Sequence, residues 1–224
     1  MYSSIGRSYF NIDDFDKAEY YYSKALELNV GCIIVMRYGW LYHNKGEFQK
    51  ALEIEDSLCK KMDCSVICNI QRFYTHLYLS NFDLAYGYYN KAIDAGRDST
   101  YNLDLISLSY VLRELGKKEE SNNVLEEVHS KIIHQSEDYE SAFSNFILAS
   151  VYAMRNDKQK ATEYLLKFET FGYNVWFNEI KIYPLFENLW GEVEFIALVD
   201  RIEEGKAILR SKIRQMEESG EINF

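Results

Sequence analysis

The sequence has 224 residues, of which 47 % are hydrophobic and 16 % aromatic, which provides enough apolar surface for a core and is not typical of a disordered protein. Its 35 acidic and 25 basic side chains give a net charge of −10, which argues against nucleic-acid binding by phosphate neutralisation. The sequence includes one proline, and this favours long unbroken helices over a β-rich fold.

The first predicted element is a pair of helices within residues 5–28, joined by the polar turn Asp13-Asp14. Small and apolar side chains in its second half recur at three- and four-residue intervals, the spacing of one face of a helix. These residues are Ala18, Tyr21, Tyr22, Ala25 and Leu28. The sequence therefore predicts an amphipathic helix after the turn.

Four further segments of the same kind follow along the sequence. They span residues 38–61, 73–96, 108–131 and 148–171. In each one a small residue begins the second helix, at spacings of 33, 34, 36 and 40 residues. These small residues are Ala18, Ala51, Ala85, Ser121 and Ala161. A repeat of this length predicts a stack of similar helix pairs.

Glycines mark the close approaches and the chain reversals of these pairs. Two helices cross closely only where one of them offers a small side chain, so we expect Gly6 to face Ala18 and Gly39 to face Ala51. Gly46 and Gly116 stand at the end of a first helix, where a residue in the left-handed conformation ends the helix.

The segment NIDDFDKAEYYYSKALEL at residues 11–28 resembles the second half of a tetratricopeptide repeat unit. Five units of this kind cover residues 1–172, with an irregular helical bundle as the alternative. The resemblance implies an all-α, right-handed superhelix of about five helix pairs. Because the first helix lacks its opening turn, we expect the sequence to be part of a longer array, with a genuine short N-terminus as the alternative.

Residues 173–224 form a second region, predicted to cap the array. Residues 176–202 resemble the segment that closes repeat arrays in bacterial multidomain regulators, where a proline-led turn places Phe and Leu on the last helix pair. The side chains expected to cover that pair are Trp176, Phe177, Phe186, Leu189, Trp190, Phe195 and Leu198.

A long helix is predicted over residues 193–218, and two arrangements remain open for it. Its apolar residues continue at helical spacing to Met216, which suits either packing back on the solenoid or projection as a dimerisation helix. Gly205 and Lys206 interrupt the apolar stripe.

A ligand of such a solenoid is expected on the concave face, which the first helices line. The residues predicted to point into this groove are Arg7, Asn11, Met36, Arg37, Trp40, His43, Asn44, Gln71, Arg72, Tyr78, Tyr110 and Arg113. Arginine and aromatic side chains are over-represented at binding hot spots, and arginine pairs with carboxylates. We therefore predict an acidic peptide or the C-terminus of a polypeptide as ligand. The alternative is that these side chains only stack on one another in solvent.

The sequence shows no pattern that indicates catalysis, a metal site or a cofactor. It contains no phosphate-binding glycine loop, nucleophile elbow or HExxH motif. Four cysteines, Cys32, Cys59, Cys64 and Cys68, are too few for a disulfide framework and are expected to pack as small buried hydrophobes. His129 and His134 lie on different faces of one helix, so they cannot share a metal.

Together these patterns predict a non-catalytic scaffold that binds a protein or peptide, within a larger bacterial regulatory or signalling protein. We expect no cofactor, no nucleic-acid partner and no membrane insertion, because no apolar run approaches the roughly 20 residues that span a bilayer. Without a secretory signal at the N-terminus, a cytoplasmic location is expected. The alternative function is self-association as a homodimer through the C-terminal helix and the capping segment.

Overall fold

The computed structural model describes residues 1–28, 31–138, 140–172 and 176–222, and the side chains of these except at 136–138, 176 and 177. Every regular element in these ranges is helical, so the predicted all-α fold is confirmed. Among the described residues, each helix is either too short or too polar to span a bilayer. The first ten helices are α1 Tyr2–Asn11, α2 Phe15–Glu27, α3 Ile33–Asn44, α4 Phe48–Lys61, α5 Ser65–Tyr78, α6 Phe82–Asp94, α7 Asn102–Glu114, α8 Lys118–Asp138, α9 Ala142–Met154 and α10 Lys158–Glu169.

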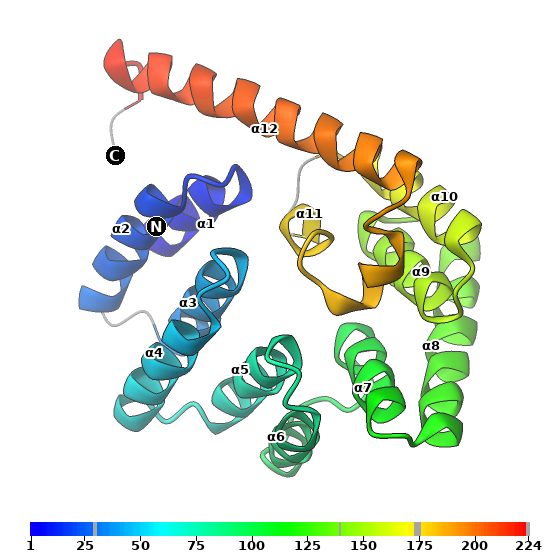
Figure 1. The fold of residues 1–224 in the computed structure, drawn as a ribbon. Coiled ribbons are helices and arrows are strands. Elements are labelled where there is room, and N and C mark those ends of the chain that lie inside the picture. The colour runs from blue at the N-terminus through cyan, green and yellow to red at the C-terminus, as the bar shows by residue number, and fades with distance from the viewer. Residues whose placement is uncertain (29–30, 139, 173–175, 223–224) are drawn as a thin grey trace.

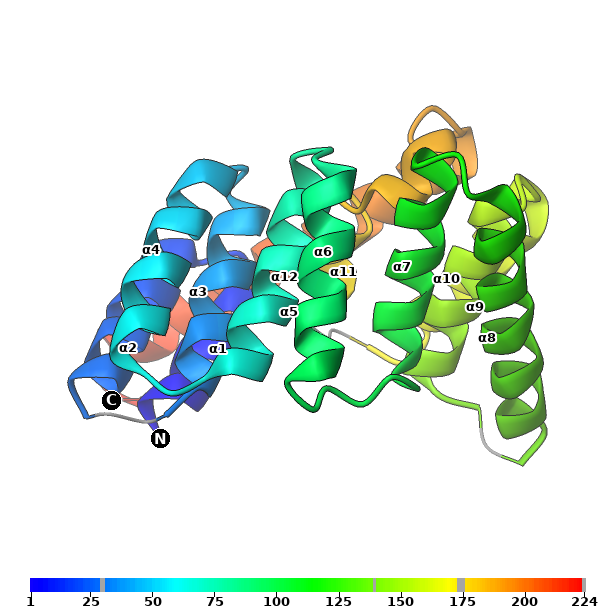
Figure 2. The ribbon, with the colours of Figure 1, turned by 90° about the horizontal axis from the view of Figure 1, so that it is seen from below.

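These ten helices pack as consecutive pairs, and each pair packs on the next to form an arc (Figure 1). The first helix of each pair lies on the concave side of the arc and the second on the convex side (Figure 1). Turned by 90°, the pairs stand side by side along the stack with the C-terminal helix passing behind them (Figure 2). The predicted helical solenoid is therefore confirmed.

All five pairs use the same backbone turn between their two helices. One residue of each turn has a positive φ of 57–78°: Asp13, Gly46, Ser80, Gly116 and Asn156. The following amide donates to a carbonyl five residues earlier at 2.9–3.0 Å, which satisfies an end carbonyl of the first helix. The left-handed residues predicted at Gly46 and Gly116 are confirmed, and aspartate, serine or asparagine takes that place in the other three turns.

Gly6 lies where the first two helices approach closely, as expected. A Cβ atom at this position would stand 3.1 Å from the Ala18 carbonyl oxygen and 2.6 Å from the buried ring of Tyr22. At Gly39 the nearest neighbours are polar side chains rather than Ala51. A Cβ atom there would stand 2.6 Å from Nε2 of Gln71 and 3.0 Å from Oε1 of Glu55, because α3 approaches α5 and polar side chains of α4 at this point.

Gly6→Leu is therefore expected to destabilise the protein by about 1–3 kcal/mol, since the new side chain has no room beside Tyr22. Gly87 in α6 is the matched control, because a Cβ atom there would meet nothing within 4 Å. Gly87→Leu is expected to keep or raise the stability, because leucine is the better helix former. Chemical denaturation of both variants measures this, and equal losses would contradict the close packing at Gly6.

The hydrophobic core is divided in two near the junction of the second and third pairs. One cluster belongs to the first two pairs and the start of α5, and the other begins at Ile70 and runs to the C-terminal region. Buried polar side chains of α3, α4 and α5 lie at the junction: His43, Glu55, Gln71 and Thr75.

Two disulfides tie the same junction together, so the expectation of unpaired cysteines is wrong. Cys32 at the start of α3 pairs with Cys64 before α5, and Cys59 of α4 pairs with Cys68 of α5, with Cα–Cα distances of 5.6 and 6.0 Å. The pairing of the cysteines depends on the stacking of α3, α4 and α5, and the spacing of the cysteines along the sequence does not show this stacking. The sequence therefore suggested only that they are small hydrophobic residues.

The C-terminal region folds back across the opening of the arc. It comprises α11 Trp176–Glu179, the 3₁₀ helix η1 Pro184–Leu189 and α12 Val193–Glu218. Phe186, Leu189, Phe195 and Leu198 are buried with residues of α9 and α10, whereas Trp190 is 40 % exposed. Trp176 and Phe177 of the expected cap lie outside the described side chains.

The helix α12 begins beside α10 and runs across the opening of the arc to the first helix pair, as Figure 1 shows. Leu209 and Ile213 pack against the core of the first two pairs. The Lys206 ammonium is fully buried and donates to the Asp13 carboxylate at 3.1 and 3.2 Å and to Oδ1 of Asn178. The residue that seemed to interrupt the apolar stripe therefore anchors the helix to the first turn.

Candidate functional site on the concave face

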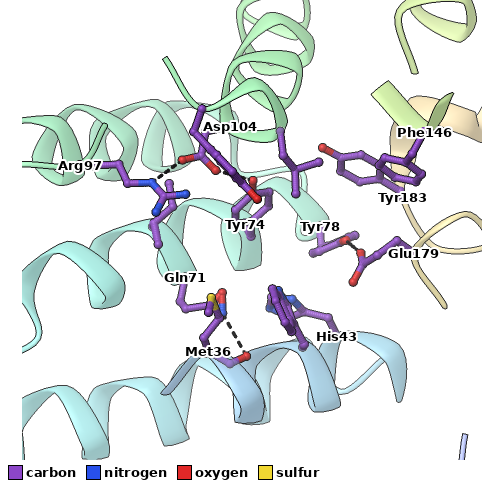
Figure 3. Close-up of a pocket in the computed structure, with 14 residues that line it drawn as sticks. Met36, His43, Gln71, Tyr74, Tyr78, Arg97, Asp104, Phe146, Glu179 and Tyr183 are labelled. Carbon is purple, nitrogen blue, oxygen red and sulfur yellow. Dashed lines mark hydrogen bonds and ion pairs between the residues drawn. The ribbon is translucent and has the colours of Figure 1, made fainter. Parts of the chain in front are cut away.

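A cavity of about 260 Å³ lies on the concave side, between α3, α5, α7 and α9 (Figure 3). Six aromatic rings line it, together with a few polar groups. The rings belong to Trp40, Tyr74, Tyr78, Tyr101, Phe146 and Tyr183. An apolar, aromatic lining with a small number of placed polar groups is typical of ligand sites.

One wall of this cavity comes from the segment between α11 and η1, which lies inside the arc (Figure 1). Tyr183 is buried, and its hydroxyl bonds to Ser107 of α7. Asn178 is also buried and donates to the Phe10 carbonyl at 3.0 Å, at the end of α1. The sequence pattern placed this segment only on the last pair, because its contacts with α1 and α7 depend on its return across the arc.

Glu179 extends from α11 to the edge of the cavity and is held by two neutral donors. Tyr78 donates its hydroxyl to Oε2, and Asn44 donates to Oε1 at 3.5 Å. Among the described residues, no basic side chain forms an ion pair with Glu179. Burial raises the pKa of this carboxyl, while the two hydrogen bonds partly oppose the rise.

Asp104 of α7 is the second carboxyl of the cavity, and it does have a cationic partner. Nε of Arg97 donates to it at 2.6 Å, and the Tyr74 hydroxyl donates at 2.7 Å. The Arg97 guanidinium lies 4.7 Å from the centroid of the Tyr101 ring. This wall therefore already surrounds one cation with an aromatic ring and a carboxylate.

The structure brings five of the twelve predicted groove residues to the cavity. These are Met36, Trp40 and His43 of α3 with Gln71 and Tyr78 of α5. Asn44 contacts the site indirectly through Glu179. The remaining six, Arg7, Asn11, Arg37, Arg72, Tyr110 and Arg113, do not line it.

Two of the predicted arginines are engaged elsewhere. Arg72 pairs with Asp56 of α4 at 2.5 Å and lies over the Tyr88 ring of α6, which are helices of the convex side. Arg113 bonds to Glu114 at 3.2 Å and to the Met154 carbonyl at 3.4 Å. Successive residues of a helix point in different directions, so an error of one residue in register moves a side chain that was predicted on the concave face to another face.

Two arginines remain available at the end of the groove formed by the first two pairs. Arg7 is exposed on α1, and Arg37 lies over the Trp40 ring at 5.5 Å. Nε of Arg37 is buried and has no hydrogen-bond partner among the described residues. Burial accordingly lowers the pKa of Arg37.

His43, which lines the cavity, takes part in a buried series of hydrogen bonds with α4 and α5. Its Nε2 lies 2.7 Å from the Thr75 hydroxyl, which donates to Oε1 of Glu55 at 2.9 Å. Burial lowers the pKa of His43 to about 3 and raises the pKa of Glu55 to about 8. Both groups are therefore uncharged at neutral pH, and the cluster is a polar layer of the core with no exposed nucleophile.

The cavity residues that the sequence did not suggest come partly from helices and partly from the segments between them. Arg97 and Tyr101 precede α7, and Glu179 and Tyr183 belong to the returning segment. The longer spacing of 36 residues between Ala85 and Ser121 was the sequence signal near Arg97 and Tyr101. Within the part of the protein that the structure describes, no group of three or more His, Cys, Asp or Glu side chains could hold a metal ion.

Residues 1–29 match the tetratricopeptide repeat family, and they include the first helix pair and its turn. No curated protein matches the sequence. The four pairs that follow repeat the turn of the matched pair. The matched first unit and these four repetitions together support a protein of the tetratricopeptide repeat type.

Proposed function

We propose that the protein is a non-catalytic scaffold that binds a protein partner through a segment inserted on the concave face. The tetratricopeptide architecture is typical of proteins that interact with other proteins. The observation that carries the proposal is the aromatic cavity between α3, α5 and α7, which is shaped by residues from five parts of the sequence. The polar groups around it are hydrogen bonded in a fixed arrangement, so a ligand would meet a preformed site.

Site-specific photo-crosslinking tests this proposal. A benzophenone amino acid at Met36, which lines the cavity, is expected to form adducts with a partner in the lysate of the source organism. Tyr20 is the matched control, because it is 56 % exposed on α2 of the convex side. Adducts at position 20 and none at position 36 would contradict a concave binding site.

An acidic segment or a polypeptide C-terminus as ligand is supported by Arg37, which has no carboxylate partner among the described residues, and by its neighbour Arg7. These two side chains lie beside the cavity rather than in it. A partner that reaches both places would contact the first two pairs with acidic groups and the cavity with another side chain.

Self-association through α12 is the alternative function. The inner apolar residues of α12 are packed in the two core clusters, so a dimer would have to use its exposed Val193, Ile196 and Ile208. Light scattering on the full-length sequence separates the two functions, since the scaffold is expected to be monomeric without its partner.

The cellular setting remains a proposal as well. The resemblance of residues 176–202 to array-closing segments supports a place in a larger bacterial regulatory protein. The two disulfides favour an oxidising compartment over the predicted cytoplasm, because disulfides are rare in reducing cytosol. Alkylation of the thiols in intact cells, followed by mass spectrometry, distinguishes these locations.

A further inference from the structure

The cavity is small for a cofactor and large enough for one long side chain. Its volume of about 260 Å³ lies below the range of roughly 300–1,000 Å³ that small-molecule sites occupy. Rings of Trp40, Tyr78 and Tyr183 contribute flat apolar surface from three different elements. Such surface suits an aliphatic stem or a weakly hydrated cation.

No positive charge of the described cavity lining is left to face Glu179 once the internal pair of Arg97 and Asp104 is set aside. Asp104 and Arg97 neutralise each other at 2.6 Å. The uncharged His43 adds nothing at neutral pH, because burial lowers its pKa to about 3. This leaves the Glu179 carboxyl, whose described partners are the neutral side chains of Tyr78 and Asn44.

The hydrogen-bonding capacity of the Glu179 carboxylate also favours a cationic ligand. A carboxylate offers about four acceptor positions, and the two described donors to Glu179 occupy only two of them. The hydroxyls of Tyr74 and Tyr183 are already bonded, to Asp104 and Ser107, so neither competes for that carboxyl. What the site lacks is a charged donor.

On the opposite wall of the cavity, an aromatic ring and a carboxylate already surround a cation. There the Arg97 guanidinium lies over the Tyr101 ring and bonds to Asp104. Glu179 has the aromatic neighbours Tyr78 and Tyr183 but no basic partner among the described residues. A cation bound to Glu179 would give this wall the arrangement that Arg97 gives the opposite wall.

We infer that the cavity binds the cationic side chain of a lysine or arginine residue of the partner, with its charged head on Glu179 and its stem against the aromatic rings. This inference rests on the proposed function of the concave face. The net charge of −10 also favours the approach of a basic partner segment.

Calorimetric titration with short peptides tests the inference. The probes are blocked pentapeptides with glycine flanks and a central lysine, trimethyl-lysine, arginine, glutamine or glutamate. At least one of the three cationic peptides is expected to bind about tenfold or more tightly than the glutamine peptide, with no binding of the glutamate peptide. Preference for the glutamate peptide would overturn the inference and point to Arg37 instead.

Glu179→Gln is expected to abolish this preference for the cationic peptides. Glutamine keeps an acceptor for Asn44 and a polar group for Tyr78, so the fold is expected to persist, which circular dichroism checks. Glu187→Gln is the matched control, because Glu187 is exposed on η1 and does not line the cavity. Equal binding by wild type and Glu179→Gln would overturn the inference.

The pH dependence supplies a readout that a purely structural role would not change. Binding needs the ionised carboxylate, and burial raises the pKa of Glu179, so binding is expected to weaken from pH 8 to pH 5 in the wild type. Failure of the peptides alongside successful crosslinking from Met36 would reject the cationic ligand and leave the concave scaffold standing. Peptide binding without crosslinks from Met36 would support a cationic ligand in the cavity and count against a protein partner on the concave face.

Discussion

Between pH 6.5 and pH 8 the protein is expected to lose about 2 kcal/mol of unfolding free energy through Glu55, and Glu55→Gln is expected to prevent that loss. The folded pKa of Glu55 is raised to about 8 by burial, so its stabilising neutral form is fully present below the unfolded value near 4.5. As the pH rises from 4.5 to 8, unfolding releases a proton and stability falls by about 1.4 kcal/mol per unit.

His43 has the opposite dependence, because burial lowers its folded pKa to about 3. Its contribution to stability is present above the unfolded value near 6.5 and is lost as the pH falls toward 3. Between pH 4.5 and 6.5 the two effects cancel, so the loss through Glu55 becomes visible only above pH 6.5. In Glu55→Gln the alkaline loss disappears and the acid loss remains.

Urea denaturation at pH 5, 6.5 and 8 measures these differences. Glu53→Gln is the control, because Glu53 is an exposed residue of the same helix and is expected to follow the wild type at every pH. A Glu55→Gln variant that loses as much stability above pH 6.5 as the wild type would contradict a neutral Glu55 in the core.

Reduction of the two disulfides is expected to cost about 2–4 kcal/mol per bond, because each one restricts the unfolded polypeptide. The Cys32–Cys64 bond closes a sequence separation of 32 residues and the Cys59–Cys68 bond one of 9. The longer loop should contribute more, since the entropy of closing it is greater. Both bonds cross the polar junction of the second and third pairs, where the hydrophobic core is interrupted.

Denaturation with and without a phosphine reductant tests this, using double serine variants of each pair. The Cys32→Ser, Cys64→Ser variant is expected to be less stable than the Cys59→Ser, Cys68→Ser variant, and reductant should affect each through its remaining bond. Four free thiols in the untreated folded protein would contradict both disulfides.

The fold was predictable because its information is local. Each pair repeats a small residue, a left-handed turn residue and a helical apolar stripe within about 34 residues. At Gly6, Gly46 and Gly116 these signals describe the observed turn and crossing. At Gly39 they do not reveal the nearest neighbours, which are the polar side chains of Gln71 and Glu55.

The site was predictable only where the first helices alone determine it. Trp40 and Tyr78 were placed by helical periodicity, whereas Glu179 and Tyr183 reach the cavity only because the C-terminal region folds back inside the arc. Lys206 shows the same limit. Its role depends on Asp13, which is 193 residues away in sequence, and no pattern within α12 reveals that partner.

The returning segment also changes how the groove is understood. Its concave surface is partly covered by the protein's own α11 and η1, so the proposed ligand site is a cavity with a wall from this segment rather than an open trough (Figure 1). Under the proposed function, a partner presents individual side chains to the cavity, and Glu179 and Tyr183 help to determine which of them is accepted.

An intermolecular nuclear Overhauser experiment with the lysine or the arginine peptide, whichever binds more tightly, tests the central claim most directly. The side-chain methylene protons of its central residue are expected to give contacts to the indole of Trp40 and to the rings of Tyr78 and Tyr183, with none to Trp190, which does not line the cavity. Contacts to Trp190 alone, or contacts that persist unchanged in Glu179→Gln, would contradict a concave cavity that binds a partner's cationic side chain.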